Sequence, residues 1–183
     1  MVSRDLRLLT PRLVLRPTEP EDAARLCEIQ SDWDVTRMLR MADWPPDPVA
    51  MQAWVASHPA EWARGEAYRF AVLFEGRLIG QADIDEIAGG EGDLGYWLER
   101  PTWGAGLASE AARALVEFAF GDLALRRIRS GHAVENVASG RILEKLGFHA
   151  LDVAPRPSRP RQELVLHRRM ELRTTLDFAT GAP

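Results

Sequence analysis

The stretch TWGAGLASEA, residues 102–111, decides the fold of this chain. It joins a predicted strand, LGYWLE at 94–99, to the strongest helical pattern of the sequence, which runs up to Gly121. Gly104 and Gly106 lie in the connecting loop. Free backbone N–H groups at the positive end of a helix bind anions, and glycine lets the backbone approach a phosphate closely. A tight turn and a phosphate-binding loop explain this stretch equally well.

Outward from that loop, alternating and helical hydrophobic patterns predict a mixed α/β chain. The other predicted strands are RLVLR (12–16), YRFAVLF (68–74), RLIGQADID (77–85), RRIRSGHAV (126–134), HALDV (149–153) and ELVLHRRMEL (163–172). The other predicted helices are TEPEDAARLCEIQ (18–30), an irregular region at 41–66, and ENVASGRILEKLGF (135–148). The pattern therefore places the glycine loop between a strand and a helix in the middle of the domain.

The positions of the prolines support two further predictions. In the irregular region, Asp47 and Pro48 are expected to begin a helix, which Pro59 is expected to interrupt. Near the end of the chain, APRPSRPRQ at 154–162 contains three prolines and three arginines, so we expect a loop. The tail at 173–183 is expected to fray.

Composition limits the class of protein. The chain has 183 residues, 46% of them hydrophobic, which suits a single domain over 1–183. A net charge of −4 argues against nucleic acid or an anionic membrane as the partner. The N-terminus lacks a signal-peptide pattern, and the lone Cys27 fits a reducing compartment, so we expect a cytoplasmic protein.

Several chemistries find little support in the motifs. Leu107 and Ala108 follow Gly106 where a P-loop needs Lys and Ser or Thr. The dinucleotide fingerprint ends on Ser109 in place of its third glycine and follows the wrong strand, which disfavours an NADP-binding oxidoreductase. The four histidines lack metal-ligand spacing, so no metal is expected.

Three segments in chain order carry a resemblance to a known family. They are TPRLVLRPTEPEDAARL (10–26), GYWLERPTWGAGLASEA (95–111) and NVASGRILEKLGF (136–148). Together they resemble the GNAT superfamily of acetyl-CoA-dependent N-acetyltransferases, within it the RimJ/RimL-like branch. The resemblance covers about residues 8–172. It implies a mixed, mostly antiparallel sheet of six to seven strands with flanking helices, in which the central fourth and fifth strands splay apart.

The resemblance also implies a site for coenzyme A. A loop of the form (Gln/Arg)-x-x-Gly-x-(Gly/Ala) wraps the pyrophosphate in this family. The six matching positions here are Trp103, Gly104, Ala105, Gly106, Leu107 and Ala108, and Ser109 follows them. Trp103 departs from the family's Gln or Arg. Backbone groups of Tyr96, Trp97 and Leu98 would bind the pantetheine arm, and one N–H there would stabilise the oxyanion, while Asn136 would contact the same arm.

Direct transfer of the acetyl group to an amine needs an acid that protonates the leaving thiolate and a base that removes the extra proton of the ammonium. The family's usual tyrosine acid is replaced by Leu143, but the branch that this chain resembles often has a serine where Ser139 stands, so the resemblance makes Ser139 the candidate acid. Asp93 is the first candidate for the base, with His132, Asp83 and Asp85 as competitors.

The acceptor stays open between a protein N-terminus and a small-molecule amine, and a homodimer is allowed. Arg156, Arg159 and Arg161, with the Trp33/Trp44 region, are expected at the acceptor rim, and their charge suggests an acidic acceptor. An unstructured basic loop is the alternative for these arginines. A non-catalytic acyl-CoA-binding module is the alternative to an enzyme.

Overall fold

The computed structural model describes residues 2–174, so the expected tail lies, from residue 175 on, outside the described residues. The elements in chain order are β1 (Leu8–Leu9), β2 (Leu13–Pro17), the 3-10 helix η1 (Pro20–Asp22), α1 (Ala23–Gln30), α2 (Trp33–Thr36), α3 (Pro48–Arg64), β3 (Tyr68–Phe74), β4 (Arg77–Ala88), β5 (Glu91–Leu98), the 3-10 helix η2 (Arg100–Thr102), α4 (Leu107–Gly121), β6 (Arg127–Ala133), α5 (Val137–Lys145), β7 (His149–Ser158) and β8 (Glu163–Arg173).

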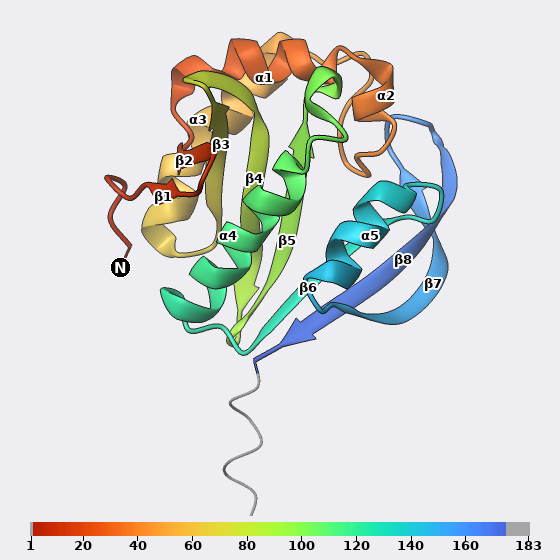
Figure 1. Ribbon diagram of the computed structural model, residues 1–183. Coiled ribbons are helices and arrows are strands. Elements are labelled where there is room, and N and C mark those ends of the chain that lie inside the picture. The colour runs from red at the N-terminus through yellow and green to blue at the C-terminus, as the bar shows by residue number, and fades with distance from the viewer. Residues whose placement is uncertain (1, 175–183) are drawn as a thin grey trace, which may run out of the picture.

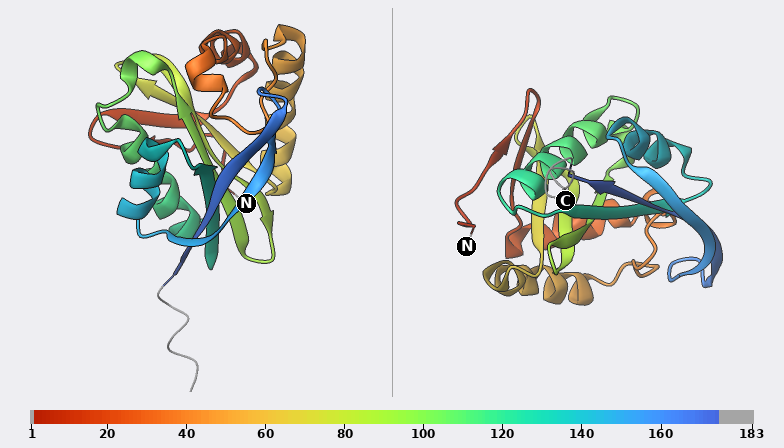
Figure 2. Two further views of the ribbon diagram at one scale, coloured as in Figure 1. Left: turned by 90° about the vertical axis from the view of Figure 1, so that its right-hand side faces the viewer. Right: turned by 90° about the horizontal axis from the view of Figure 1, so that it is seen from below.

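The strands form one sheet in the order β1-β2-β3-β4-β5-β6-β8-β7. Every neighbouring pair is antiparallel except β5 and β6, which are parallel. Helices α4 and α5 cover one face of the sheet, and α1 and α3 cover the other (Figures 1 and 2). The predicted mixed, mostly antiparallel class is thus confirmed, with eight strands in the described part. Within residues 2–174, none of the helices has the length and apolar character to cross a membrane.

The main hydrophobic core lies between the sheet and α4. Leu115 and Phe118 of α4 are fully or almost fully buried, and the Phe118 ring packs 5.4 Å from that of Phe70 on β3. Fully burying each such side chain stabilises the fold by about 1.5–3 kcal/mol. A smaller cluster joins α1 to α3, with Trp97 of β5 packed against it. Residue 97 therefore faces the α1/α3 side of the sheet.

Strands β5 and β6 pair over only three residues. The parallel register runs from Glu91 opposite Arg127 to Asp93 opposite Arg129, and the pairing ends there. Beyond that point the Ser130 hydroxyl donates to the Leu94 carbonyl over 2.9 Å, in place of a backbone bond. The two central strands then diverge toward the glycine loop (Figure 1), so the expected splay is confirmed.

The prediction that Pro59 interrupts the helix was wrong. Helix α3 begins as expected, where the Asp47 side chain accepts from the Val49 N–H over 2.9 Å. It then continues through Pro59 to Arg64. The missing proline N–H costs one helical bond, but the buried Val55 and Trp62 fix the turns on both sides of it against the protein.

The prediction of a loop at 154–162 was also wrong. The strand expected at 149–153 continues to Ser158, and only the next four residues turn into β8. Pro155 and Pro157 are tolerated because β7 is an edge strand, whose outer side needs no N–H donors. The two-residue strand β1 was missed, because a pair of leucines carries no alternating pattern.

Candidate active site

The glycine loop adopts a conformation that requires its glycines. Gly104 and Gly106 have φ of +78° and +79°, and helix α4 begins directly after them at Leu107. A Cβ on Gly104 would meet nothing within 4 Å, so the backbone is open to a ligand there. The first helical bond runs from the Glu110 N–H to the Gly106 carbonyl, and the N–H groups of the residues between them belong to the unpaired first turn. Such an end binds an anion such as a pyrophosphate.

Trp103 fastens this loop to the end of β5. Its indole Nε1–H donates to the Leu98 carbonyl over 2.9 Å, while 48% of the residue stays exposed. The Trp103 side chain therefore anchors the loop, and its one polar group is already used in that hydrogen bond. A cation that the sequence analysis missed lies beside the loop instead. Arg12 Nη1 donates to the Ala105 carbonyl over 2.8 Å, and Glu110 holds the same guanidinium by an ion pair of 2.7 Å.

Every second residue of β5 turns its backbone N–H and carbonyl toward β6 and the gap between the two strands. The Leu94 carbonyl faces β6, since it accepts from Ser130. Backbone direction alternates along a strand, so Tyr96 also faces the gap and Trp97 faces β4, where it lies opposite Gln81. The Leu98 carbonyl is already bonded to Trp103. Of the three predicted backbone positions, Tyr96 thus has the N–H and carbonyl best placed for a ligand in the gap.

The candidate acid lies on the α5 side of the same gap. Ser139 Oγ is 2.8 Å from the Tyr96 hydroxyl, and its backbone N–H donates to the Asn136 side chain over 3.2 Å. Asn136 is thus the N-cap of α5, and both predicted residues come together there. Burial raises the pKa of Tyr96 to about 12, so its phenol stays protonated and can donate. Sequence reasoning missed this phenol and considered only the backbone of residue 96, while the tyrosine position of the family is a buried Leu143.

Asp93 and His132 lie apart from each other. Burial, followed by the neighbouring Glu86 carboxyl, raises the pKa of Asp93 to about 7, and Arg129 pairs with it at 3.2 Å. His132 points toward α5, where a Cβ on Gly140 would lie 2.9 Å from its ring. Its Nδ1 is 2.8 Å from the Ala133 carbonyl. Asp93 instead shares a sheet face with Asp85, its cross-strand neighbour.

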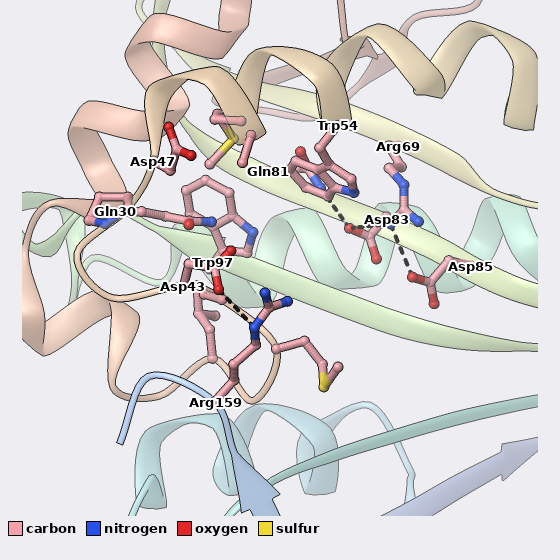
Figure 3. A pocket seen from close by; sticks show the side chains of 16 residues that line it. Gln30, Asp43, Asp47, Trp54, Arg69, Gln81, Asp83, Asp85, Trp97 and Arg159 are labelled. Carbon is pink, nitrogen blue, oxygen red and sulfur yellow. Dashed lines mark hydrogen bonds and ion pairs between the residues drawn. The ribbon is translucent and has the colours of Figure 1, made fainter. Parts of the chain in front are cut away.

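A cavity of about 460 Å³ opens on the other side of the sheet from α5 (Figure 3). Its apolar walls include Met51 and Trp54 of α3 and Trp97 of β5. Four carboxylates and two guanidinium groups line it, namely Asp43, Asp47, Asp83, Asp85, Arg69 and Arg159. Within residues 2–174, no group of three or more His, Cys, Asp and Glu is arranged to hold a metal ion.

Two of the three arginines expected at the acceptor rim are held by ion pairs. Arg159 pairs with Asp43 at 2.7 Å, and its backbone N–H donates to the Arg40 carbonyl. Arg161, in the turn between β7 and β8, pairs with Glu135, which lies just before α5. Arg159 alone of the three lines the cavity, and the rings of Trp33 and Trp44 pack against each other at a tilt of 55°, with centroids 4.9 Å apart. The excess of carboxylates favours a cationic group over the acidic acceptor that the arginines suggested.

The site thus has two approaches that meet at Tyr96 and its neighbours on β5. On one side lie the glycine loop, the gap and Ser139, and on the other lies the acidic cavity. A carbonyl held at the Tyr96 N–H could receive an amine from the cavity while the leaving group departs toward Ser139.

Comparisons with known proteins agree with this geometry. A family model described as an acetyltransferase (GNAT) domain matches residues 12–149. The N-acetyltransferase p20 of Bacillus licheniformis is 33% identical over 145 residues, which are 77% of this chain and 81% of that protein. The [ribosomal protein uS5]-alanine N-acetyltransferase of Escherichia coli is 28% identical over 155 residues, 78% of each chain. The structure of Mycobacterium smegmatis RimJ in complex with CoA-disulfide superposes with a TM-score of 0.81 at 21% identity, covering 92% of this chain and 85% of that one.

Proposed function

The chain belongs to the GNAT family of N-acetyltransferases, and we propose that it transfers the acetyl group of acetyl-CoA to the α-amino group of a polypeptide. The observation that carries the proposal is the β5–β6 gap, which has the glycine loop at its open end and an acidic cavity across β5. Acetyl-CoA supplies the activated acetyl group there. The chain's own residues bind it, orient it and handle the protons.

On the donor side, the backbone of residues 104–109 would hold the pyrophosphate, and Tyr96 and Asn136 the pantetheine arm. The space over Gly104 and the unpaired first turn of α4 support this assignment. The Tyr96 N–H would stabilise the carbonyl oxygen as it gains negative charge, an effect of about 2.7–4 kcal/mol for one such donor. Ser139 would give a proton to the leaving thiolate, and the Tyr96 phenol would hold Ser139 in place.

Two observations favour an α-amine as acceptor. Deprotonating an α-amine of pKa about 8 at pH 7 costs about 1.4 kcal/mol, against about 4.6 kcal/mol for a lysine of pKa about 10.4. A single carboxylate acting as base is enough to deprotonate the α-amine at the lower of these two costs. The E. coli relative named for the alanine of ribosomal protein uS5 supports a protein acceptor as well. A homodimer stays a prediction.

The test follows free thiol while the protein is incubated with acetyl-CoA and a panel of amines. The panel contains hexapeptides that differ in their first residue, the same peptides N-acetylated, free lysine and aliphatic diamines. Thiol release with the free peptides alone supports the proposal. Release with only the small amines would instead assign a metabolite acceptor, and acetyl-CoA binding without release on any amine would assign the non-catalytic module.

A further inference from the structure

A buried amide oxygen lacks a partner in the acidic cavity. Gln81 is 1% exposed, and its Nε2 donates to Asp83 Oδ2 over 2.9 Å. Among the described residues, its Oε1 has no hydrogen-bond partner, although it is buried and the side chain lines the cavity (Figure 3). An unpaired buried acceptor costs about 1–3 kcal/mol. Such a group is expected where a ligand brings the missing donor.

Asp83 is the cavity carboxylate that lies against β5 at the gap. Its cross-strand neighbour is Gly95, and a Cβ on that glycine would lie 2.6 Å from Asp83 Oδ1. Gly95 directly precedes Tyr96, whose backbone faces the gap. Asp85 is two residues further along β4, opposite Asp93, where β5 and β6 are still paired. Asp83 is therefore the nearer of the two carboxylates to the point at which the gap opens.

The charges around Asp83 keep it both ionisable and basic. Burial, followed by the neighbouring Asp85, raises the pKa of Asp83 to about 6. Arg69 of β3 opposes this shift from 3.6 Å, and Glu61 of α3 adds a second negative charge. Asp43, Asp47 and Arg159 are the other charged groups that line the cavity, and Asp93 lies opposite Asp85.

We propose that Asp83 and Gln81 form the acceptor-amine site, in which Gln81 Oε1 and the Asp83 carboxylate accept N–H bonds from a primary ammonium and Asp83 takes one of its protons. This inference rests on the proposed function. The neutral nitrogen then forms a bond to the acetyl carbon, and the C–S bond breaks with its electron pair on sulfur. Ser139 gives its hydroxyl proton to the thiolate and regains one from the second proton that the nitrogen loses, and Asp83 returns its proton to water.

The lining of the cavity also indicates which kind of first residue the acceptor carries next to its amine. Met51, Trp54 and Trp97 form apolar walls next to the two polar residues. An acceptor peptide whose first residue is small or apolar would bury that residue's side chain against these walls. A first residue with a carboxylate would meet the excess of acidic groups, so it is expected to be the poorest acceptor.

The test compares Asp83→Asn with the wild type and with Asp122→Asn, a control that removes an exposed carboxylate just after α4. In the wild type, kcat/KM should rise with pH through about 6, as Asp83 loses its proton, and fall above about 8, as the ammonium is lost. Asp83→Asn should lower kcat/KM at pH 7 by about 100-fold or more. It should also leave a single rise through about 8, since only the neutral amine then reacts. An unchanged rate and profile in Asp83→Asn would overturn the inference while thiol release still supports the proposed function.

Gln81→Leu is the second variant, and it decides the matter if Asp83→Asn does not fold. It removes the unpaired Oε1 together with the Nε2 hydrogen bond to Asp83, so a purely structural Gln81 predicts lower thermal stability with an unchanged KM for the peptide. A binding role predicts a KM for the peptide at least about tenfold higher at unchanged KM for acetyl-CoA. An unchanged KM for the peptide in Gln81→Leu would overturn the binding role of Gln81.

Calorimetry separates the inference from the proposed function. A hexapeptide with a free α-amine should bind the wild type at least about tenfold tighter than its N-acetylated form, and Asp83→Asn should lose this preference. If no peptide is acetylated but the preference is present, the proposed function fails and the amine site stands. Equal binding of both peptides to the wild type would overturn the amine site.

Discussion

Replacing Gly104 with alanine tests whether the glycine loop holds an anion or merely turns the chain. Gly104 has φ of +78°, and a Cβ there would meet nothing within 4 Å. Gly76, in the hairpin between β3 and β4, is a matched control, because it has φ of +77° and equally open surroundings. An L-residue in this left-handed conformation costs about 1–2 kcal/mol. Both variants should therefore lose the same stability, about 2–8 °C in Tm for a domain of this size.

Ligand binding should distinguish the two variants. A methyl group at residue 104 would occupy the open space over the loop, where the pyrophosphate is expected to approach the backbone. The Kd for acetyl-CoA, measured by isothermal titration calorimetry, should therefore rise at least about tenfold in Gly104→Ala, about 1.4 kcal/mol. It should stay at the wild-type value in Gly76→Ala. Equal affinities in the two variants would refute the phosphate assignment and leave the glycines as turn residues.

Two further predictions concern the phenol at the gap and a buried histidine. Tyr96→Phe removes the partner of Ser139, so kcat should fall about fivefold, equivalent to about 1 kcal/mol, and an unchanged kcat in steady-state assays would show that Ser139 needs no positioning. Burial, followed by Arg69 and Arg4, lowers the pKa of His58 to about 3, so the unfolded chain takes up its proton first as the pH falls below about 6.5. The His58 contribution to the free energy of unfolding should therefore fall by about 1.4 kcal/mol per pH unit between about 6.5 and 3, and an NMR titration of the His58 ring with a midpoint near 6 would contradict this.

Local patterns in the sequence were sufficient for most elements. The hairpin between β3 and β4 follows from Glu75-Gly76, and both residues have the positive φ that a tight turn requires. Asp47 caps α3 as expected, and Asn136 caps α5. The failures are the elements that depend on neighbours far along the chain. Pro59 is tolerated by the packing of its helix, and the prolines of β7 are tolerated by its place at the sheet edge.

The candidate site was partly predictable for the same reason. The local pattern pointed to the glycine loop, and the resemblance of the segment 136–148 to the family added Asn136 and Ser139. The Tyr96 phenol and Gln81 were missed, because their roles depend on which face of the sheet each residue occupies. One signal was available in the strand at 77–85. Gln81, Asp83 and Asp85 alternate with apolar residues, and a polar stripe along a strand in the middle of a domain suggests a lined cavity.

The register between β4 and β5 explains why one short segment can serve both sides of the reaction. Backbone direction and side-chain direction both alternate along a strand, so Tyr96 turns its N–H to the gap and its phenol to α5. Its neighbour Gly95 faces the cavity and lacks a side chain, which lets the Asp83 carboxylate reach the β5 backbone. A slip of one residue would put Tyr96 in the cavity and Gly95 at the gap. The order Gly95-Tyr96 therefore couples the proposed donor and acceptor sites in a way that neither residue could achieve alone.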